Sequence, residues 1–191
     1  MARIDPLPPR EWPEEMRAAL AALRPADATL PPPRTEGRPK ALNALGTFAR
    51  YPALARAFHT FNGHVLFATS LSERQRELAV LRVAALRRCE YEWRQHAVLA
   101  GDIGIGPGEL ARVAEGPDAP GWTPEERSLL AAVDELVGDG AVSEATWDEL
   151  ARDLDTHQLM DLVFTVGAYD LLAMAFRSFG VELDADLVGD Q

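Results

Sequence analysis

The chain has very little cysteine and a shortage of positive charge, and both deficits exclude classes of protein. Cys89 is the only cysteine in 191 residues, which excludes an intrachain disulfide, a cysteine-rich zinc site and a Cys-x-x-Cys redox pair. Lysine and arginine total 19 against 30 aspartates and glutamates, so the formal net charge is −11. Nucleic acids and anionic membranes both attract clustered cations, so we expect neither as a partner.

The N-terminus also lacks the apolar stretch of a signal peptide, and we therefore predict a cytoplasmic protein. The most apolar segment runs from Leu159 to Phe176, but Asp161 and Asp170 interrupt it. Charges at such positions favour a buried helix over a membrane span. Hydrophobic residues make up 47% of the chain, which is too much for a disordered protein and enough for a real core.

Alternation typical of strands is absent, and the hydrophobic pattern is helical almost throughout. Ser72 with Gln75, and Thr123 with Glu126, have the spacing of capping boxes that begin helices. We therefore predict an all-α fold, a single-domain bundle of about seven helices.

The distribution of proline and glycine indicates where the helical domain begins and ends. Residues 1–40 are predicted to form an N-terminal arm with a short helix and a proline-rich linker, since prolines disfavour a helix there. The helical domain is expected over residues 41–183, followed by a short tail, residues 184–191. Within the long apolar helix, Gly167 indicates close contact with another helix.

The densest group of polar side chains lies between Cys89 and His96. Glu92 and His96 are four residues apart, which places them on one helical face within contact range. A carboxylate that orients an imidazole forms a couple suited to acid–base catalysis. A surface ion pair of little energetic value explains the same spacing equally well.

Glu77 lies on the preceding predicted helix among apolar residues. A carboxylate in such surroundings needs a partner. If the two helices form a hairpin, Glu77 faces Glu92 and His96 across it. The other interpretation places Glu77 on the solvent side, in a salt bridge with Arg74 or Arg82.

Two segments, Arg76–Val83 and Cys89–His96, resemble the carboxymuconolactone decarboxylase family, which shares the all-helical alkylhydroperoxidase D-like (AhpD-like) fold. The resemblance continues in Leu159–Tyr169 and covers roughly residues 42–183. Glu77 combined with the Tyr-Glu-Trp-x-Gln-His motif is typical of one branch of the family. The arm before Lys40 is not part of the shared core.

The resemblance implies two kinds of chemistry. The peroxidase branch has a glutamate, then Cys-x-x-Cys, then a histidine four residues later, and these positions fall on Glu77, Cys89, Glu92 and His96. Because Glu92 replaces the second cysteine, a dithiol peroxidase mechanism is unsupported. The decarboxylase branch resembles Glu-x-x-x-His, which matches Glu92 and His96, and its enzymes act on a carboxylated muconolactone without a cofactor.

Three functions are open at this point. The first is an acid–base enzyme without cofactor or metal, which decarboxylates, isomerises or eliminates from a small cyclic acid or lactone. In it His96 is the proton shuttle, Glu92 its orienter or partner base, and Glu77 a second base. Tyr91 and Cys89 would contact the substrate. The second is a peroxide-handling protein that uses Cys89 as its one reactive thiol. The third is a non-catalytic ligand-binding protein in which Glu77, Glu92 and His96 are paired and sealed from solvent.

The resemblance also implies a homo-oligomer, either trimer-based or dimeric. The proline-rich arm is then a candidate strap between subunits.

Overall fold

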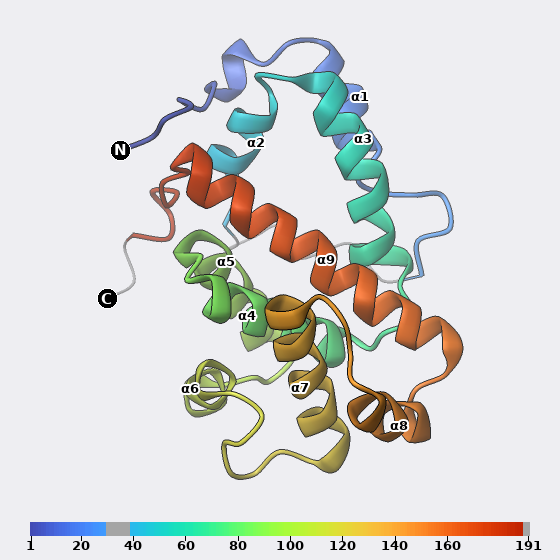
Figure 1. Ribbon diagram of the computed structural model, residues 1–191. Helices are drawn as coiled ribbons and strands as arrows, with labels where there is room; N and C mark the ends of the chain where they lie inside the picture. The colour runs from blue at the N-terminus through green and yellow to red at the C-terminus, as the bar shows by residue number, and fades with distance from the viewer. Residues whose placement is uncertain (30–38, 189–191) are drawn as a thin grey trace. The chain divides into compact units, whose positions relative to one another are not determined.

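The computed structural model describes residues 1–29 and 39–188, and over these residues it contains nine α-helices and no strand (Figure 1). The all-α class is thus confirmed, and the nine helices of the described residues include α1 in the arm, where a short helix was predicted outside the bundle of about seven. The helices are α1 (Glu15–Ala21), α2 (Leu42–Phe48), α3 (Pro52–Gly63), α4 (Glu73–Arg87), α5 (Glu90–Asp102), α6 (Pro107–Glu115), α7 (Pro124–Asp139), α8 (Glu144–Asp153) and α9 (Thr156–Phe179). The proline-rich linker predicted after the arm lies largely outside the described residues.

Two compact units make up the chain. The first comprises residues 1–69 with 175–191, and the second comprises residues 70–174. The domain limits expected from the sequence stay a prediction.

The first unit packs the arm against its own helix α3. Met16 and Ala19 of α1 are buried with Ala49 and Ala55, and the ring of His59 on α3 bonds the Ala19 carbonyl at 3.0 Å. Burial is the main cause that lowers the pKa of His59, so this histidine is neutral and structural. Residues 1–29 therefore pack within the chain, and a strap between subunits stays a prediction.

The second unit is built around α4, which contacts α5, α6 and α7. Both predicted capping boxes are confirmed. The Ser72 hydroxyl accepts a hydrogen bond from the backbone N–H of Gln75, and the side-chain oxygen of Gln75 accepts one from the backbone N–H of Ser72. Thr123 and Glu126 make the same two bonds at α7. Every residue of α4 from Arg76 to Ala84 is buried, two arginines included.

Arg82 connects α4 to its neighbours. Its guanidinium bonds both carboxylate oxygens of Asp134 on α7, at 2.6 and 2.7 Å. It also donates to the carbonyls of Val113 and Ala114 at the end of α6, at 3.0 and 2.8 Å. One buried cation therefore satisfies acceptors on two other helices, as a planar guanidinium can.

Replacing Arg82 with methionine should therefore destabilise the protein by about 3 kcal/mol, because the two carbonyls and Asp134 lose their donors while the aliphatic volume is kept. Thermal or urea unfolding measures the effect. The matched control is Arg127→Met on the exposed side of α7, which should change stability by less than about 0.5 kcal/mol. Equal effects of the two changes would contradict this role of Arg82.

Helix α9 is long and apolar enough, by length and composition, to cross a membrane, and half of that stretch is buried within the protein. The buried half agrees with the core helix expected from the sequence. Among residues 1–29 and 39–188, Gly167 does not lie against another helix, because a Cβ added there would meet nothing within 4 Å. The expectation of a close intrachain contact at Gly167 was therefore wrong.

Candidate active site

The α4–α5 hairpin brings the predicted site residues together. Helix α4 ends at Arg88, which adopts the left-handed conformation with φ 51°. Only Arg88 and Cys89 separate α4 from α5, so the chain reverses at once. Residues 19 positions apart in sequence, Glu77 on α4 and His96 on α5, consequently face each other across the hairpin.

Glu77 and His96 form a buried carboxylate–imidazole pair. The His96 Nδ1 atom lies 2.7 Å from Glu77 Oε2, and the two residues are 8% and 1% exposed. An ionised carboxylate can only accept hydrogen bonds, so Nδ1 carries the hydrogen and donates it. Nε2 is then the nitrogen left for a substrate. The interpretation that placed Glu77 in solvent beside Arg74 or Arg82 was wrong.

Arg76 holds the other oxygen of Glu77. Its Nε and Nη2 atoms lie 3.2 and 3.1 Å from Glu77 Oε1. Burial raises the pKa of Glu77, but the charges and hydrogen bonds of His96 and Arg76 outweigh it and hold that pKa below its usual value. Glu77 is therefore ionised, which fixes the tautomer and orientation of His96.

Glu92 lies in a different environment on the same hairpin. It is 2% exposed, and neither carboxyl oxygen has a hydrogen-bond partner among the described residues. Burial is the main cause that raises the pKa of Glu92 to about 8. The Cys89 thiol, as a hydrogen-bond donor, lowers this pKa, and the negative charge of Asp170 raises it. Sulfur is a weak donor, so the thiol leaves both oxygens without a strong hydrogen bond. At neutral pH Glu92 is therefore mostly a neutral carboxylic acid.

Glu77 and Glu92 therefore exchange the positions relative to His96 that the sequence spacing suggested for them. The sequence predicted that Glu92 orients His96 from one helical turn away, with Glu77 as an additional base. In the structure Glu77 is the hydrogen-bond partner of His96. A spacing of four residues brings side chains near each other but does not decide which of two acceptors the imidazole chooses.

Helix α9 adds residues that the sequence reasoning did not assign to the site. The Tyr169 ring meets the His96 ring edge-on, with ring centroids 4.9 Å apart and an angle of 88°. Burial, with the nearby charge of Glu77, raises the pKa of Tyr169 and keeps the phenol neutral. Asp170 is paired with Arg87 at the end of α4. Tyr169 lies in a segment that carries the family resemblance, and this was the only signal that could have found it.

The two expected substrate contacts lie on the same hairpin. Cys89 directly precedes α5 and is 2% exposed, while Tyr91 is 5% exposed in the first turn. The Tyr91 hydroxyl lies 3.4 Å from the Gln95 side-chain nitrogen, which donates to it. All five predicted residues are therefore buried in one helical hairpin of the second unit.

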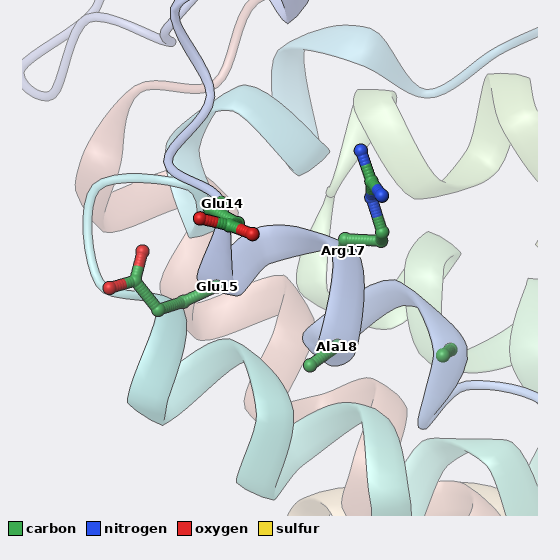
Figure 2. A pocket seen from close by; sticks show the side chains of 5 residues that line it. Glu14, Glu15, Arg17 and Ala18 are labelled. Carbon is green, nitrogen blue, oxygen red and sulfur yellow. The ribbon is translucent and has the colours of Figure 1, made fainter.

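A shallow hollow on α1 lies in the first unit and contains none of these residues. It is lined by Glu14, Glu15, Arg17, Ala18 and Ala21, and Arg17 points away from the two carboxylates (Figure 2). Its side chains are those of an exposed helix and define no chemistry. Within residues 1–29 and 39–188, no three metal-ligating side chains gather at one place.

The all-helical fold that holds this carboxylate–imidazole pair matches that of the AhpD-like proteins. Residues 52–135, which include Glu77, Glu92 and His96, match the carboxymuconolactone decarboxylase family. The predicted resemblance to this family is thus confirmed over these residues. Among curated proteins, none matches the chain.

Three solved structures have a similar fold. The debrominase Bmp8 shares 16% identity over 97% of this chain and 94% of its own, with a TM-score of 0.71. A peroxidase-related protein from Silicibacter shares 14% identity over 87% and 97%, with a TM-score of 0.70. The alkylhydroperoxidase AhpD core of a peroxidase-related protein from Ralstonia eutropha shares 18% over 85% and 95%, with a TM-score of 0.66. At sequence identities this low, the similarity to these structures shows a shared fold and nothing further.

Proposed function

We propose that this protein is a cofactor-independent acid–base enzyme that moves protons on a small cyclic acid or lactone. The observation that carries the proposal is Glu92, a buried carboxyl with a raised pKa and no hydrogen-bond partner among the described residues, on the same hairpin as the oriented Glu77–His96 couple. One hairpin thus holds a neutral acid and an ionised pair. Two titratable groups whose environments push their pKa values apart are the usual arrangement of an acid and a base.

The roles follow from the hydrogen bonds. Glu77 holds the Nδ1 hydrogen of His96, so Nε2 can take a proton from a substrate carbon and Glu77 stabilises the imidazolium that forms. Glu92 can donate its proton to the oxygen or carbon where negative charge develops. Isomerisation uses both transfers, and decarboxylation needs only a donor to the carbon that loses carbon dioxide.

A purely structural role explains Glu92 poorly. The pairing of Glu77 with His96 and their burial also agree with a non-catalytic protein. However, a buried carboxyl without a partner costs stability, since its desolvation is not repaid by hydrogen bonds. An unpaired polar group that a fold retains is typical of a site that waits for a ligand.

The neighbouring structures support a small ring as the substrate class. A variant of Bmp8 with a cysteine replaced by alanine was solved in complex with 2,3,4-tribromopyrrole, and it has 16% identity and a TM-score of 0.70 to this chain. The same fold therefore accommodates a compact cyclic ligand in that protein. The substrate proposed here has a similar size but an acidic or lactone group that can accept the Glu92 proton.

Incubation in heavy water with a panel of small cyclic carboxylic acids and lactones tests the proposal. Proton NMR should detect carbon dioxide loss, double-bond migration or deuterium incorporation in at least one compound. His96→Asn should show none of these. Compounds that bind to the wild-type protein but never exchange or react would point to the non-catalytic alternative.

The lone thiol offers a separate test, because a peroxide-handling protein would depend on Cys89. Its thiol is buried, and buried cysteines react slowly with oxidants. We expect Cys89→Ser to keep turnover of the cyclic substrate within about tenfold, since serine is similar in size and the side chain at this position takes no part in the proposed proton transfers. Mass spectrometry after mild peroxide should find Cys89 unoxidised. Peroxide consumption that disappears in Cys89→Ser would support the thiol mechanism instead.

A further inference from the structure

Thr165 carries a buried hydroxyl that no other described group satisfies. The residue lies near the middle of α9 and is 0% exposed, and its Oγ1 atom has no hydrogen-bond partner among residues 1–29 and 39–188. A threonine inside a helix often bonds the carbonyl four residues back, as Thr47 does to the Asn43 carbonyl at 2.8 Å. Because Thr165 lacks this bond, its hydroxyl is available to a group outside its own helix.

Two contacts locate Thr165 relative to α4. Asp161, one turn before it, accepts hydrogen bonds from the backbone N–H and the hydroxyl of Ser70, which precedes α4. Asp170, five residues after it, is paired with Arg87 at the end of α4. Helix α9 therefore passes α4 in the same general direction, and Thr165 lies between these two contacts.

Thr165 also shares a helical face with Tyr169, the residue that packs on His96. Four residues of helix turn by about 400° and rise by about 6 Å, so the two side chains lie about 40° apart on neighbouring turns. Besides burial, the charges of Glu77 and Glu92 raise the pKa of Tyr169, which places this face of α9 against the candidate site. The site therefore has an unpartnered hydroxyl one turn away from the Tyr169–His96 contact.

Unpartnered groups are concentrated in these two parts of the second unit. Five buried side-chain atoms of the described residues have no hydrogen-bond partner, and three of the five belong to Glu92 and Thr165. Each such atom costs stability, because water no longer bonds it and the protein does not replace the water. A ligand that brings oxygen atoms to both residues would supply the missing partners.

We propose that the Thr165 hydroxyl donates a hydrogen bond to a carbonyl oxygen of the substrate ring, while Glu92 binds a second oxygen of the same molecule. This contact, which rests on the proposed function, narrows the substrate class to small rings that carry two oxygen functions. Two hydrogen bonds hold a ring in one orientation, so that one of its carbons stays next to Nε2 of His96. Thr165 is then a specificity-determining residue, because a site built to bond an oxygen rejects a molecule that lacks it.

Two ring acids that differ by one carbonyl test this contact. 3-Oxocyclopentanecarboxylate should bind the wild-type protein about tenfold more tightly than cyclopentanecarboxylate, as measured by calorimetry, because only the first accepts a hydrogen bond from Thr165. Thr165→Val replaces the hydroxyl with a methyl group and keeps the branched shape. In this variant the preference should disappear, and the keto acid should bind no more tightly than the plain acid.

Thr47→Val is the matched control, because the Thr47 hydroxyl is also buried but has its bond to the Asn43 carbonyl. This variant should keep the tenfold preference and unfold at a lower temperature than the wild type. Thr165→Val should unfold at the wild-type temperature or higher, since it loses no hydrogen bond. A fall as large as that of Thr47→Val would show that the Thr165 hydroxyl is bonded within the fold, which overturns the proposal.

The binding data separate this proposal from the proposed function. An unchanged preference in Thr165→Val, or equal binding of the two acids to the wild type, would overturn the role of Thr165 and leave the acid–base chemistry standing. A wild-type protein that binds neither acid would also overturn that role. Reaction or exchange of the cyclic compounds in heavy water then decides separately whether the proposed function holds.

Discussion

His96→Asn should reduce turnover of the cyclic substrate by at least about a hundredfold and leave the fold intact, since a positioned general base contributes about 10²–10⁴ in rate. The asparagine amide can still donate to Glu77 from roughly the position of Nδ1, so the buried carboxylate keeps a partner. What the variant lacks is Nε2, the atom that accepts the proton. The loss should therefore appear in kcat, with little change in KM.

The matched control is His157→Asn, which changes an exposed histidine in the first turn of α9. This variant should keep wild-type turnover and thermal stability. Glu77→Gln should resemble His96→Asn in activity, because a neutral amide no longer stabilises an imidazolium. Full activity in His96→Asn, with native circular dichroism, would remove the acid–base mechanism.

Glu92→Gln should also reduce turnover by about a hundredfold or more, because glutamine cannot donate a catalytic proton. The wild-type enzyme needs Glu92 protonated and Glu77 ionised, so its activity should fall as the pH rises through about 8. The residual activity of Glu92→Gln should lack the limb near pH 8. A variant that retains this limb would show that another group titrates there.

The same substitution should change how stability depends on pH. Because the pKa of Glu92 is raised in the folded protein, the folded chain keeps a proton that the unfolded chain loses above the ordinary glutamate pKa of 4.5. The stability linked to this proton is complete below pH 4.5 and is lost as the pH rises to about 8, a change of about 5 kcal/mol. Glu92→Gln should thus be more stable relative to the wild type at pH 9 than at pH 5.

Glu90→Gln is the control for both measurements, because Glu90 is an exposed residue in the same first turn of α5. It should change neither the pH–activity profile nor the pH dependence of unfolding. If urea unfolding gives Glu92→Gln and the wild type the same pH dependence, Glu92 is ionised in the folded protein and cannot act as the acid.

Local signals predicted much of the fold. The capping boxes at Ser72 and Thr123 begin helices where expected because these hydrogen bonds involve residues three apart. The hairpin that joins Glu77 to His96 followed from two adjacent helices with a short break. These features depend on near neighbours in the chain, which a single sequence contains.

The remaining parts of the site depend on distant contacts. Tyr169 reaches His96 from 73 residues along the chain, and no periodicity indicates such a meeting. Among the described residues Glu92 has no hydrogen-bond partner, because the His96 hydrogen goes to Glu77, which also accepts from Arg76. Which of the two carboxyls accepts this hydrogen depends on three-dimensional packing. Gly167 shows the same limit, since a glycine in an apolar helix predicted a close helix contact that the described residues do not provide.

The most direct test of the central claim is a carbon NMR titration of protein labelled at the glutamate side-chain carboxyl, with Glu92→Gln used to assign the resonance. The claim is that one hairpin holds a neutral carboxylic acid beside an ionised carboxylate–imidazole pair. We predict one glutamate carboxyl that titrates near pH 8 and is missing from Glu92→Gln, while Glu77 stays ionised throughout. A Glu92 carboxyl that titrates in the ordinary range near pH 4.5 would contradict the account.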